Sequence, residues 1–197
     1  MSTKLGHSFY LNDNVVKIAK SLLGKVLVTS MEGVVTSGMI VETEAYSWKE
    51  QGCHAFNHKR TKRNEPMYYG GGISYVYLCY GVYELFNVVT NQEGIPEAVL
   101  IRALEPIDGI ASMLERRKTT HATRITSGPG KLTRALGISR QHNGTDIAGD
   151  SIWIEDRNIV VKPSQIVRSS RIGLNVKGED ALLPWRFTIK SNVWVSK

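Results

Sequence analysis

The stretch from Ile73 to Thr90 limits the possible folds of this chain more than any other segment. It is dense in aromatic and β-branched residues, which favour strands, and it is interrupted once, at Tyr80-Gly81. This pattern predicts two antiparallel strands joined by a tight turn. The turn carries a large aromatic side chain, where small polar residues are usual. The fold is therefore expected to include a β-hairpin with an aromatic ring at its tip.

Strand-like segments outnumber helix-like segments in the rest of the chain, and the two kinds do not alternate regularly. The other expected strands cover residues 25–30, 34–44, 97–104, 151–155, 165–169 and 185–190. The expected helices cover residues 14–23, 107–118 and 128–136. This irregular order favours the α+β class. We therefore expect one compact mixed domain over residues 1–197, built on a curved, largely antiparallel sheet with a protruding β-hairpin.

The length and the absence of export signals bear on the type of protein. A chain of 197 residues can bury one sizeable core. No apolar run approaches the roughly 20 residues of a membrane span, and the N-terminus lacks the apolar stretch of a secretion signal. We expect a monomer that is not secreted, located in the bacterial cytoplasm or nucleoid or in a eukaryotic nucleus. Cys53 and Cys79 form no CxxC pair and are expected to be reduced.

The net charge of +7 is placed unevenly along the chain. Residues 1–100 carry nine Lys/Arg and nine Asp/Glu, whereas residues 101–197 carry sixteen against nine. Residues 116–140 hold seven basic residues and no acid, and residues 59–63 form a second basic cluster. Such patches suit a polyanionic partner, because each neutralised phosphate releases counterions; a solvated surface is the alternative. The candidates for contacts with a DNA backbone are Lys59, Arg63, Arg117 and Lys131.

Two carboxylates stand close together before a long loop. On a strand, Glu42, Glu44 and Tyr46 point to the same side. Carboxylates beside an aromatic ring at the end of a strand are well placed for general base catalysis, and a solvated strand edge is the alternative. The following residues, 47–72, are polar, basic and glycine-rich, and long loops of this kind are usually functional.

The hairpin concentrates tyrosines. Tyr75, Tyr77, Tyr80 and Tyr83 lie within nine residues, and Tyr75 and Tyr77 share a strand face. A pocket lined by tyrosine faces can hold a planar, electron-poor base by stacking and by cation–π attraction. The ring of Tyr80 at the tip can enter a base stack. Cross-strand aromatic packing is the alternative.

Residues with capping side chains precede two of the expected helices. Asn12 or Asp13 can cap the first helix, and Ser127 is the expected N-cap of the third. The segment from Ser127 to Lys131 presents free N–H groups and a lysine that can seat a phosphate, or it is an ordinary cap. It is not a P-loop, because Ile125 stands where a glycine is required, so ATP is not expected.

The loop also contains a cysteine and two histidines at metal-ligand spacing. Cys53, His54 and His58 lack a fourth ligand and a second cluster, so we expect neither a metal nor another cofactor. His54 fits better as a hydrogen-bond partner in a pocket.

Six segments taken together resemble the alkyladenine (3-methyladenine) DNA glycosylase family. They come in the family's order and span the chain from about residue 18 to residue 196. The segments are Ile40-Val-Glu-Thr-Glu-Ala-Tyr46, Arg60-Thr-Lys-Arg-Asn64, Tyr75-Val-Tyr-Leu-Cys-Tyr-Gly81, Leu100-Ile-Arg-Ala-Leu-Glu-Pro106, Ser127-Gly-Pro-Gly-Lys-Leu132 and Pro184-Trp-Arg-Phe187. The resemblance implies a base-excision repair enzyme that flips alkylated or deaminated purines out of duplex DNA and hydrolyses the N-glycosidic bond. The partner implied is double-stranded DNA, with no obligate protein partner.

The resemblance also implies a role for each site residue. Glu44 is the implied base that activates water, and Arg102 positions that water. Tyr80 is the implied wedge that replaces the flipped nucleotide. The implied pocket residues are Tyr46, His54 and Tyr77 as walls, with Asn87 crowding the 2-amino group of normal guanine.

Three positions depart from the family pattern. The gap between Tyr46 and His54 is one residue shorter than in the mammalian members, Lys59 replaces an arginine, and Val82 is smaller than expected. No lysine or N-terminal proline occupies the motif as an amine nucleophile, so no lyase step is expected. Two other functions remain open: a non-catalytic nucleic-acid-binding module, since the fold resembles the C-terminal domain of methionyl-tRNA formyltransferases, and hydrolysis of free nucleosides.

Overall fold

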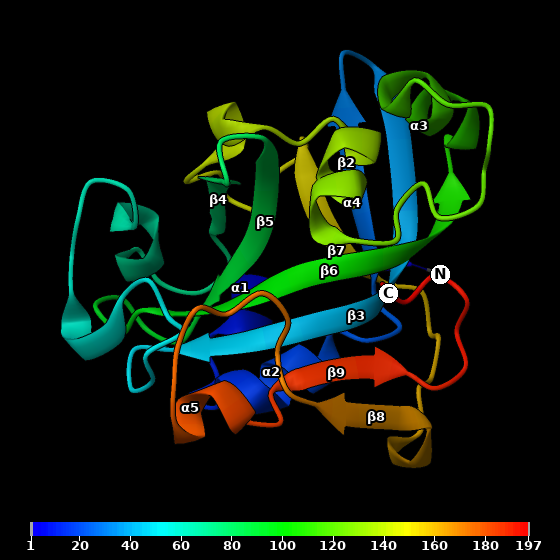
Figure 1. Cartoon of the computed structure of the whole chain (residues 1–197). Helices are drawn as coiled ribbons and strands as arrows, with labels where there is room; N and C mark the ends of the chain where they lie inside the picture. Colours follow the sequence, from blue (N-terminus) through cyan, green and yellow to red (C-terminus); the bar gives the residue numbers. More distant parts are fainter. Residues whose placement is uncertain (1, 197) are drawn as a thin grey trace.

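The computed structural model describes residues 2–196, and its strands form one antiparallel sheet (Figure 1). Within those residues the sheet has nine strands in the order β1-β7-β2-β3-β6-β5-β4, with β9 paired to β3 and β8 paired to β9. The strands are β1 (Thr3–Lys4), β2 (Val26–Met31), β3 (Val34–Ser47), β4 (Ser74–Cys79), β5 (Tyr83–Thr90), β6 (Glu97–Asp108), β7 (Ile152–Asp156), β8 (Ile166–Ser169) and β9 (Arg186–Ile189). The expected α+β fold on a largely antiparallel sheet is confirmed.

The longest strand, β3, organises the centre of the sheet. Its first half pairs with β2, part of its second half pairs with β9, and β6 follows it along almost its whole length. The β3–β6 register shifts near Glu42, where the pairing skips Val41 on β3 and Arg102 on β6. Register shifts of this kind change the direction of side chains locally. This one allows Arg102 to reach the carboxylates of Glu42 and Glu44.

The predicted hairpin is present as β4 and β5, paired from Ser74↔Val88 to Cys79↔Tyr83. At its tip, Tyr80 and Gly81 have φ values of 50° and 72°, and the Val82 N–H donates to the Cys79 carbonyl at 3.1 Å. Two positive φ values in succession match the type I′ turn, whose twist suits a hairpin. The turn leaves Tyr80 80% exposed.

The helices pack around the sheet, and some of their ends differ from the expectation. The structure has α1 (His7–Tyr10), α2 (Val15–Ser21), α3 (Ile110–Arg117), α4 (Pro129–Leu136) and α5 (Glu179–Leu182). The cap of α2 is Asn14, whose side chain accepts from the Lys17 N–H at 2.9 Å, so the prediction of Asn12 or Asp13 was wrong.

The prediction of a cap at Ser127 was also wrong. The N-cap of α4 is Gly128, and the Ser127 hydroxyl instead donates to the Val195 carbonyl at 3.2 Å. Residues 107 and 108, expected in a helix, extend β6 because they continue the ladder with β3, where Asp108 pairs with Ser37. Tertiary pairing therefore decides both boundaries rather than local preference.

Two hydrophobic cores support the fold. The larger core packs α2 against β3 and β6, and α4 against β5 and β6. The smaller core includes residues of the loop that follows β3. It consists of Cys53, Ala55, Met67, Tyr68, Tyr75, Val89 and Ala98, with Tyr46, Ile73 and Tyr77 packed against it. The second core therefore joins the tyrosines of the hairpin to the end of β3.

The predicted long loop is ordered around one buried asparagine. The Asn64 side chain is buried, and its amide nitrogen donates to the carbonyls of His54 at 2.9 Å and Lys59 at 2.8 Å. Its carbonyl oxygen accepts from the Thr61 N–H at 2.7 Å. These bonds fix the turn that carries His54. Among the helices of residues 2–196, none has both the length and the apolar composition needed to cross a membrane.

Candidate active site

A small pocket opens where the smaller core meets the sheet. It is lined by Tyr46, Gly52, Cys53, His54, Met67, Tyr75, Tyr77, Asn87 and Ala98. These residues come from β3, β4, β5, β6 and the ordered loop. The structure therefore brings together the three predicted wall residues, Tyr46, His54 and Tyr77, with Asn87.

The pocket walls are mostly aromatic. The His54 ring stands edge-on to Tyr77, with centroids 4.6 Å apart and an interplanar angle of 69°. Its Nδ1 forms a hydrogen bond of 2.8 Å with the Tyr75 hydroxyl. Tyr75 and Tyr77 lie 5.2 Å apart between centroids. Such a wall offers flat apolar surface together with hydrogen-bonding groups, as sites for small aromatic ligands do.

His54 is uncharged near neutral pH. Partial desolvation among the tyrosine rings, followed by the positive charge of Arg63, lowers the pKa of His54 to about 4. The residue still has an exposed side toward solvent. A neutral imidazole can both donate and accept a hydrogen bond, so His54 can recognise the edge of a ligand without adding charge to the pocket.

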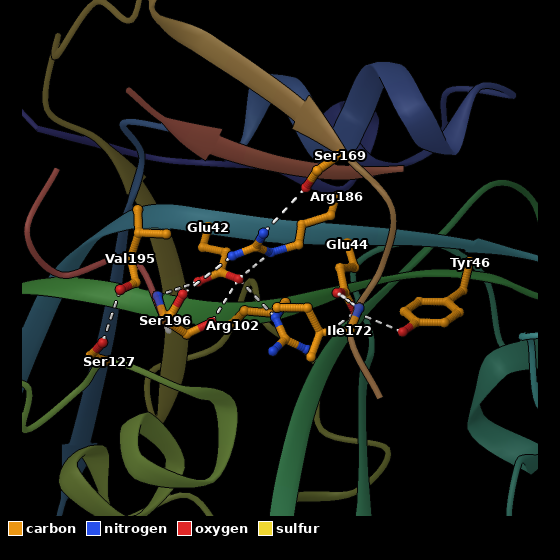
Figure 2. Close-up of polar contacts among 10 residues, drawn as sticks. All are labelled: Glu42, Glu44, Tyr46, Arg102, Ser127, Ser169, Ile172, Arg186, Val195 and Ser196. Carbon is orange, nitrogen blue, oxygen red and sulfur yellow. Dashed lines mark hydrogen bonds and ion pairs between the residues drawn. The ribbon is translucent and has the colours of Figure 1, made fainter. Parts of the chain in front are cut away.

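The Glu44 carboxylate is fully buried and bonds the pocket residue Tyr46. Its Oε2 accepts from the Tyr46 hydroxyl at 2.7 Å and from Arg102 Nη1 at 3.3 Å, and its Oε1 accepts from the Ile172 N–H at 2.8 Å (Figure 2). Burial and then the Glu44 charge raise the pKa of Tyr46 well above its usual value, so the phenol keeps its proton and donates. The three donors fix the orientation of the carboxylate.

The neighbouring Glu42 lies in a different environment. Its carboxylate accepts from Arg102 Nε at 2.9 Å, Arg186 Nε at 2.7 Å, and the backbone N–H and hydroxyl of Ser196 at 2.7 and 2.8 Å (Figure 2). Burial alone would raise the pKa of Glu42, but Arg102, Arg186 and Ser196 outweigh it and lower that pKa. Neither carboxylate lines the pocket itself, but Glu44 bonds the pocket residue Tyr46, whereas the contacts of Glu42 tie β3, β9 and the C-terminal segment together.

Arg102 connects the two carboxylates. Its guanidinium bonds Glu42 through Nε and Glu44 through Nη1. Burial alone would lower the pKa of Arg102, but the charges of Glu44 and Glu42 raise it overall. Arg102 is therefore a fixed cation between the carboxylates of Glu42 and Glu44.

The remaining predicted site residues fall in three places. Asn87 is buried at the pocket and donates to the Tyr75 carbonyl at 3.0 Å. Tyr80 lies outside the pocket, at the exposed tip of the hairpin. Lys59 is exposed, whereas the Arg63 guanidinium lies over the Tyr77 ring at 5.0 Å from its centroid. Arg63 is thus at the pocket rim.

Arg117 and Lys131 lie on the other side of the hairpin from the ordered loop, on α3 and α4 (Figure 1). Arg117 lines a groove with Tyr83 of the hairpin and Arg134 of α4. Burial and then the like charge of Arg134 lower the pKa of Arg117. The four predicted backbone contacts therefore form two basic groups, one on each side of the hairpin.

The sequence did not identify the group that lies behind the pocket. Arg171 is buried and bonds both Glu50 and the Ala45 carbonyl, and the next residue, Ile172, supplies an N–H to Glu44. Arg171 and Ala45 are 126 positions apart, and neither periodicity nor spacing links them. Only the abundance of acids near the end of β3 hinted that cations were needed there.

The cysteine and histidines of the loop have other neighbours. His58 stacks on Trp48, with ring centroids 3.9 Å apart, while His54 faces the tyrosines. Across residues 2–196, no group of three His, Cys, Asp or Glu side chains is arranged to hold a metal ion. Burial raises the pKa of Cys53 to about 12, which leaves its thiol protonated.

Comparison with known proteins identifies the family of this chain. The sequence model of the methylpurine-DNA glycosylase family matches residues 8–193. A protein of Chlamydia felis named "Putative 3-methyladenine DNA glycosylase" is 45% identical over 188 residues, which cover 94% of this chain and 95% of the relative. Relatives with the same name from Clostridium acetobutylicum and Francisella tularensis are each 45% identical, covering 98% and 92% of this chain and 97% and 93% of their own lengths. The resemblance carried by the six segments is confirmed, and the chain belongs to the methylpurine-DNA glycosylase family.

Proposed function

We propose that this chain is a monofunctional DNA glycosylase, acting as one domain over residues 1–197, that releases damaged purines from duplex DNA. It hydrolyses the N-glycosidic bond with a water activated by Glu44 and leaves an abasic site. The observation that carries the proposal is the buried Glu44 carboxylate, oriented by three donors beside a pocket walled by Tyr46, His54 and Tyr77. Membership of the family supports the class of reaction.

The pocket chemistry supports a purine as the ligand. Stacking of a base on an aromatic side chain contributes about 1–3 kcal/mol, and the walls supply several such faces. Alkylation at N3 or N7 makes the base cationic, which strengthens its attraction to a phenol face. Asn87 at the pocket would crowd the 2-amino group of normal guanine, and neutral His54 would meet the base edge.

The reaction follows from the position of Glu44. The oxygen of a water attacks C1′ of the everted nucleotide, the C1′–N bond breaks with its electron pair leaving on the base, and the water's proton passes to Glu44. The negative charge of Glu44 also stabilises the positive charge that develops on the sugar. Arg102 and the Tyr46 hydroxyl hold Oε2 of the carboxylate, and Oε1, which accepts from the Ile172 N–H, has a second lone pair for the water. A neutral lesion such as hypoxanthine leaves less readily and should react more slowly than an alkylated base.

Access to the target base requires its extrusion from the duplex, at a cost of a few kcal/mol. Tyr80 is exposed at the hairpin tip, where its ring can fill the gap left by the nucleotide. The basic groups on either side of the hairpin, Lys59 with Arg63 and Arg117 with Lys131, suit the phosphates that flank the lesion. The protein would act as a monomer. Because the relatives named above are bacterial, its proposed location is the cytoplasm or nucleoid.

A lyase step is not part of the proposal. Cleavage of the strand by β-elimination requires an amine that forms a Schiff base with the sugar. Among residues 2–196, those that line the pocket include no lysine. The abasic site should therefore persist until it is cleaved chemically.

A set of duplex oligonucleotides tests the proposal, each carrying one hypoxanthine, ethenoadenine or 7-methylguanine. After incubation with the protein, one half of each sample is treated with alkali. Strand cleavage is expected only after alkali. Cleavage without alkali would demonstrate a lyase, and tight binding of duplex without base release would favour a non-catalytic binding module. Salt-insensitive cleavage of free nucleosides would favour a nucleoside hydrolase.

A further inference from the structure

Arg171 forms an unusually enclosed ion pair behind the pocket. Its side chain is 0% exposed and that of Glu50 is 3% exposed. The pair is bidentate, with Nη1 and Nη2 at 2.6 and 2.7 Å from the two carboxylate oxygens. Burying two charges costs several kcal/mol per ion, so such a pair stabilises a fold little more than an apolar pair of the same volume. Stability alone therefore explains this arrangement poorly.

The same guanidinium contacts the site at several points. It lies over the Tyr46 ring at 4.7 Å from the centroid, and over Trp185 at 5.5 Å. Nη1 also donates to the carbonyl of Ala45 at 3.0 Å, and Ala45 stands between Glu44 and Tyr46 in β3. Arg171 therefore holds both the backbone and the ring that flank the Glu44 carboxylate.

Residues next to Arg171 and Glu50 in the chain contact Glu44 and line the pocket. The residue after Arg171 is Ile172, whose N–H donates to Glu44 Oε1 at 2.8 Å. On the other side, Glu50 Oε2 accepts from the N–H of Gly52 at 2.7 Å, and Gly52 lines the pocket. A Cβ added at Gly52 would lie 2.8 Å from Glu50 Oε2 and 3.1 Å from Arg171 Nη2, so the rim is closely fitted to the pair.

We propose that Arg171 is a positioning residue for the proposed reaction: with Glu50, it fixes the Ile172 amide on Glu44 and the Tyr46 ring on the pocket wall. The inference rests on the proposed function and adds to it a residue outside the six matched segments. An error of about 1 Å in the position of a reacting group can slow catalysis about 100-fold. Arg171 therefore acts on the chemical step, through Glu44 and Tyr46.

The test compares R171M/E50M with the wild type and with a control, R157M. The double substitution removes both charges together, so that neither is left buried alone. R157M removes ion pairs with Asp108 and Glu155, away from the pocket. For each protein, we would measure thermal unfolding, affinity for duplex containing a stable abasic-site analogue, and the single-turnover rate of base release.

In R171M/E50M, the rate should fall about 100-fold while affinity for the duplex and cooperative unfolding are retained. R157M should release base at the wild-type rate. If R171M/E50M is folded and releases base at the wild-type rate, the inference is wrong. Failure of the wild type to release any base would instead contradict the proposed function.

A second variant covers the case in which R171M/E50M does not fold. I172P removes the N–H that reaches Glu44 and fixes φ at a residue that is 43% exposed. Its rate of base release should fall about 10-fold, in keeping with the loss of one hydrogen bond to a charged group, while affinity for the duplex is unchanged. An unchanged rate in folded I172P would overturn the inference as well.

Discussion

Replacing Glu42 with glutamine should destabilise the protein strongly although the side chain keeps its shape. Glu42 is fully buried and serves Arg102 and Arg186 at once, and it also accepts from both groups of Ser196. The substitution leaves two mostly buried guanidinium groups without their shared countercharge. It also places an NH2 group where only acceptors are wanted.

The magnitude follows from the enclosure of this cluster. The side chains of Arg102 and Arg186 are 8% and 15% exposed, so water can compensate little of the lost charge. Removing one partner of a buried ion pair costs about 3–5 kcal/mol. Glutamine still offers one acceptor oxygen, so we expect E42Q to lower the free energy of unfolding by about 3 kcal/mol. This is a large part of the roughly 5–15 kcal/mol that holds a typical domain folded.

The effect should depend on pH in a defined direction. Arg102, Arg186 and Ser196 lower the pKa of folded Glu42 below its usual value of 4.5. The stabilisation from its charge is therefore complete above that value and is lost as the pH falls through the lower, folded-state pKa. The difference in the free energy of unfolding between wild type and E42Q should be largest at about pH 7 and should shrink in acid.

Urea unfolding at several pH values measures this difference, with E93Q as a control at an exposed carboxylate. Comparable slopes of the unfolding free energy against urea concentration for both proteins would show that the change lies in stability. A loss of stability below about 1 kcal/mol near neutral pH, within the range of surface ion pairs, would show that the charge of Glu42 contributes little to the fold. A loss that stays constant into acid would show the same.

Three further predictions concern the pocket and the hairpin. Y46F removes a donor to Glu44, so base release should slow by about 10-fold to 100-fold, measured under single-turnover conditions; an unchanged rate would show that the phenol is dispensable. Y80A should weaken binding to a damaged duplex by about 1–3 kcal/mol in a fluorescence titration without changing urea unfolding, since the ring is 80% exposed, and equal affinity would exclude a wedge. His54 should titrate at about 4 in an NMR titration of its ring, because desolvation and Arg63 lower its pKa, whereas a midpoint at its usual 6.5 would contradict the packing seen here.

Much of the fold was predictable because it rests on local patterns. The hairpin over β4 and β5 follows from β-branched and aromatic residues interrupted by Tyr80-Gly81, and its turn needs the positive φ values that those two residues adopt. The class follows from strands that do not alternate with helices. The ends of α4 and β6 were not predictable, because the Ser127 hydroxyl and residues 107–108 find partners remote in sequence.

In the site, too, residues related by local spacing could be predicted, whereas residues that meet across the fold could not. Glu44 and Tyr46 could be paired from the two-residue period of a strand, and the resemblance supplied Arg102. Arg171 gave no signal, because its partners, Glu50 and Ala45, are more than a hundred positions away. Arg63 was expected to face a DNA backbone, yet its guanidinium lies over Tyr77. Whether Arg63 contacts phosphate remains a prediction for the complex with DNA.

The proposed role of Glu44 is tested most directly by the rate at which E44Q releases hypoxanthine from a duplex in a single turnover. Glutamine keeps the shape of the side chain, but its NH2 group cannot accept the hydrogen bonds of one carboxylate oxygen, and it cannot take a proton from water. The rate is expected to fall about 100-fold to 10,000-fold, the contribution typical of a general base, with affinity for the duplex retained. Base release by E44Q at close to the wild-type rate would show that this carboxylate does not activate the water.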